Sequence, residues 1–354
     1  MIMFTQDLLL SEAVRVTILT TISFLVTLAI TPLWMKFLKK YRFGKQLRNH
    51  EDAPVFNSLH KDKAGTPTAG GIIFVSTVIG MAAFFDVMNH LFDGMWRYFN
   101  FVSRPETYLP IAAFLIAGIL GLVDDWLGVL KLGGASGGGL KVRQKAIFYL
   151  VIALIGAWWF YFRLGWNTIT VPFVGTFIIG WWYIPIFIFI IFATAFSANE
   201  TDGLDGLLGG VALFAFGALA TVAFVLHRYD LAAFSGTIIG ALLAFLWFNI
   251  YPAKFFMGDI GSMSLGITIG VIAMLTNTVL ILPFFAVILV IESLSVIIQI
   301  TSRKLRHGKK IFRSTPIHHH FEALGWPESQ VTMRFWIVSA VFAAVGLAIF
   351  FLSR

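Results

Sequence analysis

Apolar runs of about 20 residues recur along most of the chain, separated by short polar connections. A helix needs about this many apolar residues to cross a bilayer, so the pattern predicts an all-α polytopic membrane protein. Composition agrees, because 58% of the 354 residues are hydrophobic and only 12% are charged, roughly half the charged share of soluble domains. No polar segment is long enough to fold alone, so residues 1–354 are expected to form a single integral membrane domain.

Hydropathy and turn-forming residues divide the chain into ten predicted spans. The spans cover residues 16–38, 70–88, 108–126, 146–163, 176–198, 206–227, 231–250, 260–275, 279–302 and 334–353. Residues 1–14 contain acidic but no basic side chains, so the first run is expected to be a retained span and not a cleaved signal peptide. The chain has no cysteine, which excludes disulfides and thiolate metal sites.

Lys and Arg are divided unequally between alternating loops. The loops that join spans 1/2, 3/4, 5/6, 7/8 and 9/10 hold 18 Lys and Arg residues, whereas the other loops hold only Arg97, Arg104, Arg163 and Arg228. Basic residues in short loops mark the cytoplasmic side, so both termini are predicted to lie outside. This basic face suits lipid headgroups or an anionic substrate. No nucleic-acid recognition module is found, and nucleic acid is not an expected partner.

Acidic and imidazole side chains from distant segments fall on the predicted cytoplasmic face. They are Asp124, Asp125, Glu200, Asp202, Asp205, Asp259, His318, His319 and His320. Acids at membrane spans are functional candidates because charges are costly there. The sequence therefore predicts an active-site cleft on this face.

Asp124 and Asp125 end the third predicted span in the sequence GLVDDWLG. Neighbouring helix positions point about 100° apart, so at least one of these side chains should face the bundle. The alternative is a solvated helix end, although acids at a helix C-terminus oppose the helix dipole. A functional role is favoured.

The stretch NETDGLDG places Asn199, Asp202 and Asp205 at intervals of three residues, on one face if the segment is helical. Gly203 and Gly206 would let a ligand approach the backbone closely. The alternative is a turn in which an Asp caps the sixth span. The acids outnumber what one cap requires, so a site is favoured.

Asp259 lies in FFMGDIGS, and two interpretations stay open. It could cap the eighth span, with Ser262 three residues later. It could instead bind Mg²⁺, a hard cation that prefers carboxylate oxygens and keeps several waters.

The segment PIHHHFE contains three adjacent imidazoles, His318 to His320. Three neighbouring side chains cannot easily ligate one metal, so an imidazole that acts as a donor or cation beside phosphate is favoured over zinc. A solvated polar loop is the structural alternative.

Two basic segments suit anion binding, although ordinary loops would look similar. Residues 133–145 are rich in glycine but lack a Walker sequence, so only Arg143 and Lys145 are candidates for phosphate contact. Residues 61–71 combine Lys63 with Thr68 before the second span. Glu292 and Gln299 share a helical face in the ninth span, where one of them would line the cavity.

Together these segments resemble the phospho-N-acetylmuramoyl-pentapeptide transferases of the polyprenyl-phosphate N-acetylhexosamine-1-phosphate transferase superfamily. The matching motifs are GTPTAGG, GLVDDW, N-x-TDGLDGL, FN-x-YPA-x-FFMGD-x-GS, ESLSVIIQ and P-I-HHH-FE-x-x-GWPE, in family order over residues 61–330. The resemblance implies a ten-span fold and a Mg²⁺-dependent transfer of phospho-sugar from UDP-MurNAc-pentapeptide to undecaprenyl phosphate, with release of UMP. It also implies a multi-pass protein of the bacterial plasma membrane; a homodimer is left open.

The resemblance assigns roles to matching positions. Asp124, Asp125 and Asp259 would be the central acids, with Asp259 the Mg²⁺ ligand, and His318 the required imidazole. The expected substrate contacts are Lys63, Thr68, Lys145, Asn199, Asp202, Gly203, Leu204, Asp205, Asn249, Phe256, Gln299 and His319. Phe256 is expected to stack on uracil.

The chain departs from the family pattern at three places. Ala69 stands where Met is common, Glu200 stands where an apolar residue is usual, and the glycine-rich loop lengthens the distance from the acid pair to Lys145. The rival functions are a sister enzyme that uses another UDP-sugar and, from a different class, a cation-coupled transporter. A transporter should carry its acids near the span centres and show inverted repeats, and neither is seen in the sequence.

Overall fold

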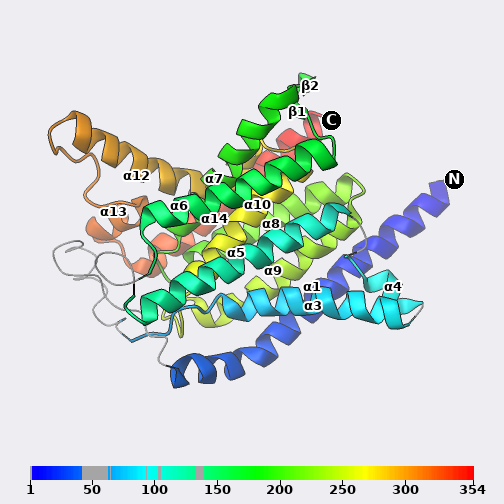
Figure 1. Ribbon diagram of the computed structural model, residues 1–354, viewed down its shortest axis with the longest axis horizontal. Helices are drawn as coiled ribbons and strands as arrows, with labels where there is room; N and C mark the ends of the chain where they lie inside the picture. The colour runs from blue at the N-terminus through cyan, green and yellow to red at the C-terminus, as the bar shows by residue number, and fades with distance from the viewer. Residues whose placement is uncertain (1, 42–62, 64, 93, 103–104, 133–138) are drawn as a thin grey trace.

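The computed structural model is a bundle of long helices with a short β-hairpin at one edge (Figure 1). It describes residues 2–41, 63, 65–92, 94–102, 105–132 and 139–354. Its elements are α1 (Ile2–Lys40), α3 (Ile72–Leu91), α4 (Met95–Phe99), α5 (Pro105–Val129), α6 (Val142–Trp158), η2 (Trp159–Arg163), β1 (Thr168–Val171), β2 (Gly175–Ile178), η3 (Gly180–Trp182), α7 (Tyr183–Thr201), α8 (Leu207–Val225), α9 (Tyr229–Asn249), α10 (Gly258–Leu275), α11 (Leu282–Phe285), α12 (Val287–Leu305), α13 (Ile317–Ala323) and α14 (Glu328–Leu352). The predicted all-α fold class is confirmed.

Nine helices in the described ranges are long and apolar enough to cross a membrane. They correspond to predicted spans one to eight and ten, so the polytopic architecture is confirmed. The predicted ninth span, 279–302, differs because the chain breaks at Ala286, between α11 and α12. α12 also carries Glu292, Arg303 and Lys304, and these charges interrupt its apolar sequence. In Figure 1 it projects away from the bundle.

α11 and α12 nevertheless return the chain from one end of the bundle to the other. α10 begins at Gly258, beside Asp202, and runs away from that end. α14 begins again at the same end, where the Glu328 carboxylate accepts a hydrogen bond from the Asp205 backbone. The segment between them must therefore cross back. The two chain termini lie at the opposite end from α13 in Figure 1, as an even number of crossings requires.

The helix of the fifth predicted span, 176–198, starts later than predicted because the first residues of that span belong to a β-hairpin. β1 pairs antiparallel with β2, with Thr168 opposite Ile178. The hairpin is rich in β-branched residues, which favour strands over helix. α7 accordingly begins at Tyr183 and not at the predicted position 176.

α10 lies at the centre of the bundle, and every residue from Ile260 to Leu275 is buried. Glycines allow this close packing: a methyl group on Gly121 of α5 would collide with the α10 backbone at Asp259, and one on Gly266 would collide with α7. The contact at Gly121 lies one helical turn before Asp124. It therefore brings the acid pair of α5 against the first turn of α10.

Candidate active site

The N-terminus of α10 is capped by carboxylates from elsewhere in the chain. Asp125 accepts hydrogen bonds from the backbone N–H groups of Asp259, at 3.1 Å, and Ile260, at 3.2 Å. Asp202, which ends α7, accepts a third from Gly258 at 3.2 Å. These bonds satisfy helix donors that otherwise have no partner, and negative charge suits this end of the helix dipole.

Asp259 does not cap its own helix, so that interpretation of FFMGDIGS is wrong. It is the second residue of α10, and its side chain points to groups on two other helices. One oxygen accepts a hydrogen bond from the Asn199 amide of α7. The other lies 2.6 Å from the Lys145 Nζ of α6.

Lys145 bridges the central acids. Its Nζ lies 2.6 Å from Asp124 Oδ2 and also 2.6 Å from Asp259 Oδ2, while the other Asp124 oxygen accepts a hydrogen bond from the Leu140 backbone. Asp124 and Asp125 are both buried. The ends of α5, α6 and α10 thus bring two carboxylates onto one ammonium group, with Asp125 next to them at the start of α10. We call Asp124, Asp125, Lys145 and Asp259 the central cluster. Its net charge is negative when all four groups are ionised.

The central cluster fits a hard divalent cation. Among the described residues, no three His, Cys, Asp or Glu side chains are arranged to hold a metal by themselves. Mg²⁺ does not require such a set, because it commonly binds one or two carboxylates and keeps several waters. Asp124 and Asp259 both reach the point where the Lys145 ammonium lies, so both could reach a cation there once the ammonium moves aside.

A second polar group joins Asp205, Lys63 and Glu328. Lys63 Nζ lies 2.6 Å from Asp205 Oδ1 and 2.5 Å from Glu328 Oε1. The Asp205 N–H donates to the same Glu328 oxygen at 2.7 Å, and Asp205 Oδ2 accepts from Ala253 at 3.0 Å. Lys63 Nζ also lies 5.6 Å from the centre of the Phe256 ring, within cation–π range. Glu328 was not predicted as a site residue, although the motif GWPE contains it.

The backbone places Thr68 and Asn249 beside this group. Pro67 accepts a hydrogen bond from the Phe256 N–H at 2.7 Å, and the Gly70 N–H donates to the Phe256 carbonyl at 2.8 Å, so Thr68 lies next to Phe256. Asn249 is buried and hydrogen-bonded at both ends of its amide: its oxygen accepts from Gly206 at 3.1 Å and its nitrogen donates to Phe255 at 2.8 Å. Leu204 is buried between the two aspartates of its loop.

The three histidines of α13 have three different partners. His318 Nδ1 lies 3.0 Å from Glu292 Oε2, and His319 Nδ1 lies 2.7 Å from Glu322 Oε2. His320 Nδ1 accepts a hydrogen bond from the Arg313 N–H at 3.1 Å. The three Nδ1 atoms therefore have separate partners, and the donor or cation role of an imidazole beside phosphate stays a prediction.

His318 is the histidine that reaches the acidic loop. Its ring lies so close to Gly203 that a methyl group at that position would collide with Nε2. Burial disfavours the charged imidazole, but the nearby carboxylates, Glu292 first and then Glu322 and Glu200, together raise the pKa of His318 above its ordinary value. The histidine and the TDGLDG segment, 115 positions apart in sequence numbering, are thus in contact.

Gln299 lies apart from these contacts. Its amide donates to the Phe312 carbonyl at 2.9 Å, and its oxygen accepts from Ile311 and Phe312 at 2.9 and 3.1 Å. It therefore fixes the loop before α13, and its substrate contact stays a prediction. Residues 133–138 of the glycine-rich loop lie outside the described residues.

Comparisons with known proteins agree with a membrane transferase. Residues 108–277, which include four of the helices that carry the site, match the family described as glycosyl transferase family 4. The chain is 38% identical to the phospho-N-acetylmuramoyl-pentapeptide-transferase of Geobacillus thermodenitrificans, over 94% of this chain and 97% of that protein. It is 36% identical to the enzyme of the same name from Chloroflexus aurantiacus, over 97% and 92%, and 41% identical to that from Shouchella clausii, over 93% and 95%.

The chain belongs to the phospho-N-acetylmuramoyl-pentapeptide-transferase family. The predicted resemblance is confirmed, and the protein is a phosphotransferase enzyme.

Replacing Gly203 by Ala is expected to lower transferase activity at least tenfold. The added methyl group would collide with the buried His318 ring, and such overpacking costs about 1–3 kcal/mol. Gly217→Ala is the matched control, because a methyl group there meets nothing within 4 Å and α8 should tolerate it. Rates and melting temperatures of both variants test this. Equal activity in the two would mean that His318 does not need its position against Gly203.

Proposed function

We propose that the protein transfers phospho-N-acetylmuramoyl-pentapeptide from UDP-MurNAc-pentapeptide to undecaprenyl phosphate, with Mg²⁺, at the cytoplasmic face of the bacterial plasma membrane. The observation that carries this proposal is the central cluster, where Lys145 joins Asp124 and Asp259 at the meeting point of four helices. The relatives bear the name of this reaction. A homodimer stays a prediction.

In the proposed reaction an oxygen of the acceptor phosphate attacks the phosphorus that carries the sugar. The bond from that phosphorus to the oxygen of UMP breaks, and its electron pair leaves with UMP. The bound Mg²⁺ would offset phosphate charge, and Asp259 with Asp124 would hold it. A route through an aspartyl-phosphate has the same overall balance.

The contacts of Asp124 and Asp125 differ, and we assign different roles to these two adjacent acids. Asp125 already accepts bonds from two backbone N–H groups, so we assign it to hold the start of α10 and thereby Asp259. Asp124 faces Lys145, and we assign to it the contact with the acceptor phosphate. Lys63, Asp205 and Phe256 form the proposed nucleotide contact, with the aromatic ring against uracil and the ammonium near phosphate.

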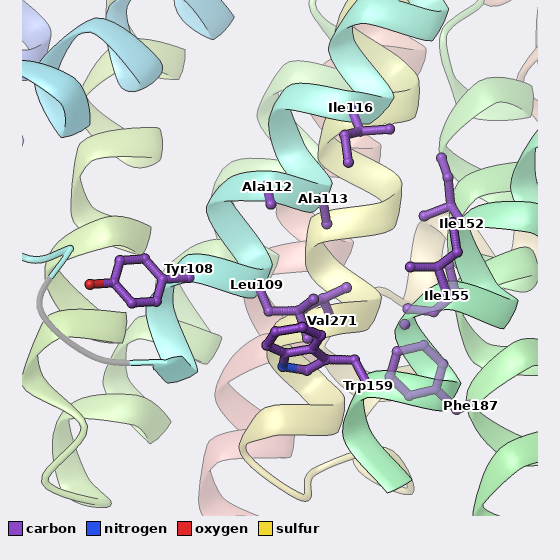
Figure 2. A pocket seen from close by; sticks show the side chains of 12 residues that line it. Tyr108, Leu109, Ala112, Ala113, Ile116, Ile152, Ile155, Trp159, Phe187 and Val271 are labelled. Carbon is purple, nitrogen blue, oxygen red and sulfur yellow. The ribbon is translucent and has the colours of Figure 1, made fainter. Parts of the chain in front are cut away.

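An apolar pocket supports a lipid acceptor. A cavity of about 240 Å³ lies among α5, α6, η2, α7 and α10, lined by side chains such as Ile116, Ile152, Trp159 and Phe187 (Figure 2). These helices also carry the central cluster. Ile116 lies about 12 Å along α5 from Asp124, and Ile152 lies about 10 Å along α6 from Lys145. A prenyl tail could therefore occupy the pocket while its phosphate lies at the cluster.

Replacing Ala112 by Phe is expected to raise the KM for undecaprenyl phosphate several-fold, because the ring would fill the pocket that Ala112 lines. Geranyl phosphate, whose tail is too short to enter far, should be affected much less. Ile119→Phe is the matched control, since Ile119 is an exposed residue of the same helix outside the pocket lining. An equal change for both acceptors, or none for the long one, would place the tail elsewhere.

One assay tests the proposed function itself. Purified protein is incubated with labelled UDP-MurNAc-pentapeptide, undecaprenyl phosphate and Mg²⁺, and the lipid product and UMP are separated by chromatography. Both products should appear together, and chelation of the metal should stop them. Product only with a different UDP-sugar would indicate the sister enzyme, and no product with any donor would contradict the proposal.

A further inference from the structure

A buried acid–imidazole pair lies against Gly203, the neighbour of the Asp202 that caps α10. His318 of α13 and Glu292 of α12 are both 0% exposed, and their Nδ1 and Oε2 atoms lie 3.0 Å apart. Each side chain also has one buried polar atom that finds no hydrogen-bond partner among the described residues: His318 Nε2 and Glu292 Oε1. Buried polar atoms are normally paired, so the free Nε2 needs an explanation.

Contact with Glu292 determines which imidazole nitrogen is free. An ionised carboxylate can only accept hydrogen bonds, so the proton of the imidazole must lie on Nδ1. Nε2 then either carries a lone pair or, in the imidazolium, presents a second N–H. In both states the same nitrogen faces outward from the pair.

The free nitrogen points to the loop that carries the acids. Nε2 is the His318 atom closest to the position that a Gly203 side chain would take. Gly203 lies between Asp202, which caps α10, and Asp205, which binds Lys63. Two other acids, Glu322 and Glu200, also act on the imidazole electrostatically, but only Glu292 is hydrogen-bonded to it.

We propose that Glu292 is a positioning residue for His318: its carboxylate holds the imidazole with Nδ1 protonated and Nε2 directed at the phosphate groups of the substrate, next to Gly203. This inference rests on the proposed function, because it takes the ligand of Nε2 to be the transferred phosphate group or its neighbour. Carboxylate–imidazole pairs fix tautomer and ring orientation in this way at other catalytic and metal sites.

Glu292→Gln tests the role because it keeps the shape of the side chain but no longer selects one tautomer of the imidazole. A carboxamide can accept from Nδ1 through its oxygen or donate to Nδ1 through its nitrogen, so either tautomer becomes compatible. We expect kcat to fall by about 10²-fold or more, the usual contribution of a positioned acid–base group, with little change in the KM for the UDP-sugar. Glu292→Asp keeps the charge and should recover part of the rate.

Nitrogen NMR of the full-length protein with isotope-labelled histidine gives a readout that does not depend on turnover. A His318→Gln variant identifies the signal among the eight histidines. The wild type should show a proton on Nδ1, and Glu292→Gln should show a mixture of tautomers or the opposite one. Glu322→Gln is the matched control: it removes the carboxylate 2.7 Å from His319, which has no hydrogen bond to His318, and should leave the His318 tautomer unchanged.

The outcomes separate this inference from the proposed function. If wild-type protein transfers no phospho-sugar, the proposed function fails, and the spectrum alone decides whether Glu292 sets the tautomer. A lower rate with an unchanged His318 tautomer, or an unchanged rate in the Gln variant, overturns the positioning role. If the Gln variant does not fold, Glu292→Asp is compared with wild type instead. An unchanged kcat together with a shifted His318 tautomer in that variant also counts against the role.

Discussion

Asp259→Asn is expected to reduce turnover by at least ~10²-fold while the protein stays folded. The substitution keeps the size of the side chain, so the hydrogen bond from Asn199 and the packing of α10 can persist. It removes the charge that lies 2.6 Å from Lys145 and that would hold Mg²⁺. Loss of the charge stabilisation that a metal gives to transferring phosphates should cost several kcal/mol in the transition state.

The measurement is the rate of lipid-product formation across a Mg²⁺ titration, together with the melting temperature in detergent. Asp86→Asn is a suitable control, because Asp86 is a partly exposed acid of α3, far along the chain from the central cluster. Near-wild-type turnover of Asp259→Asn at ordinary Mg²⁺ would remove Asp259 from the metal site. A similar loss in the control would point to a general effect of reduced negative charge.

Hydropathy was sufficient to predict most of the fold. Long apolar runs cross the bilayer as helices, because their backbone groups must be hydrogen-bonded internally. The structure differs from the prediction at two places, the hairpin before α7 and the break between α11 and α12. Residues 175–178 are apolar enough to continue a span, but their β-branched neighbours pair with them as a hairpin. Glu292 interrupts the ninth run, and only the contacts of α12 explain why a buried acid is there.

The convergence of the acids was also predictable, because topology places alternate span ends on one face. Their partners were not. Whether Asp259 caps its helix or faces a neighbour depends on which residues of other helices lie beside it, and linear spacing does not encode this. Asp125, which belongs to α5, caps α10 instead, because Gly121 lets α5 and α10 approach closely. The pairs Lys145–Asp259 and His318–Glu292 likewise join segments that hydropathy treats independently.

Replacing Lys145 by Gln is expected to destabilise the protein strongly in the absence of Mg²⁺. The ammonium is the cation that Asp124 and Asp259 share, and its removal leaves the buried Asp124 carboxylate facing the partly buried Asp259 carboxylate. Breaking a buried ion pair by removing one partner costs about 3–5 kcal/mol, because the remaining charge is uncompensated. The melting temperature in EDTA should therefore fall by several degrees or more, whereas Lys141→Gln, at an exposed position before the same helix, should leave it nearly unchanged.

Mg²⁺ should restore part of the stability of the Lys145→Gln variant. If both carboxylates can hold one divalent cation where the ammonium lies, the metal can replace the missing charge, and its binding to the folded state raises the melting temperature. The wild type should respond less, since Lys145 already occupies that point. Turnover should stay at least ~10²-fold reduced even at saturating Mg²⁺, because the metal would substitute for the ammonium in stability and not in its contact with phosphate. An unchanged melting temperature of the variant in EDTA, or stabilisation by Mg²⁺ no greater than in wild type, would mean that Asp124 and Asp259 do not share a cation site.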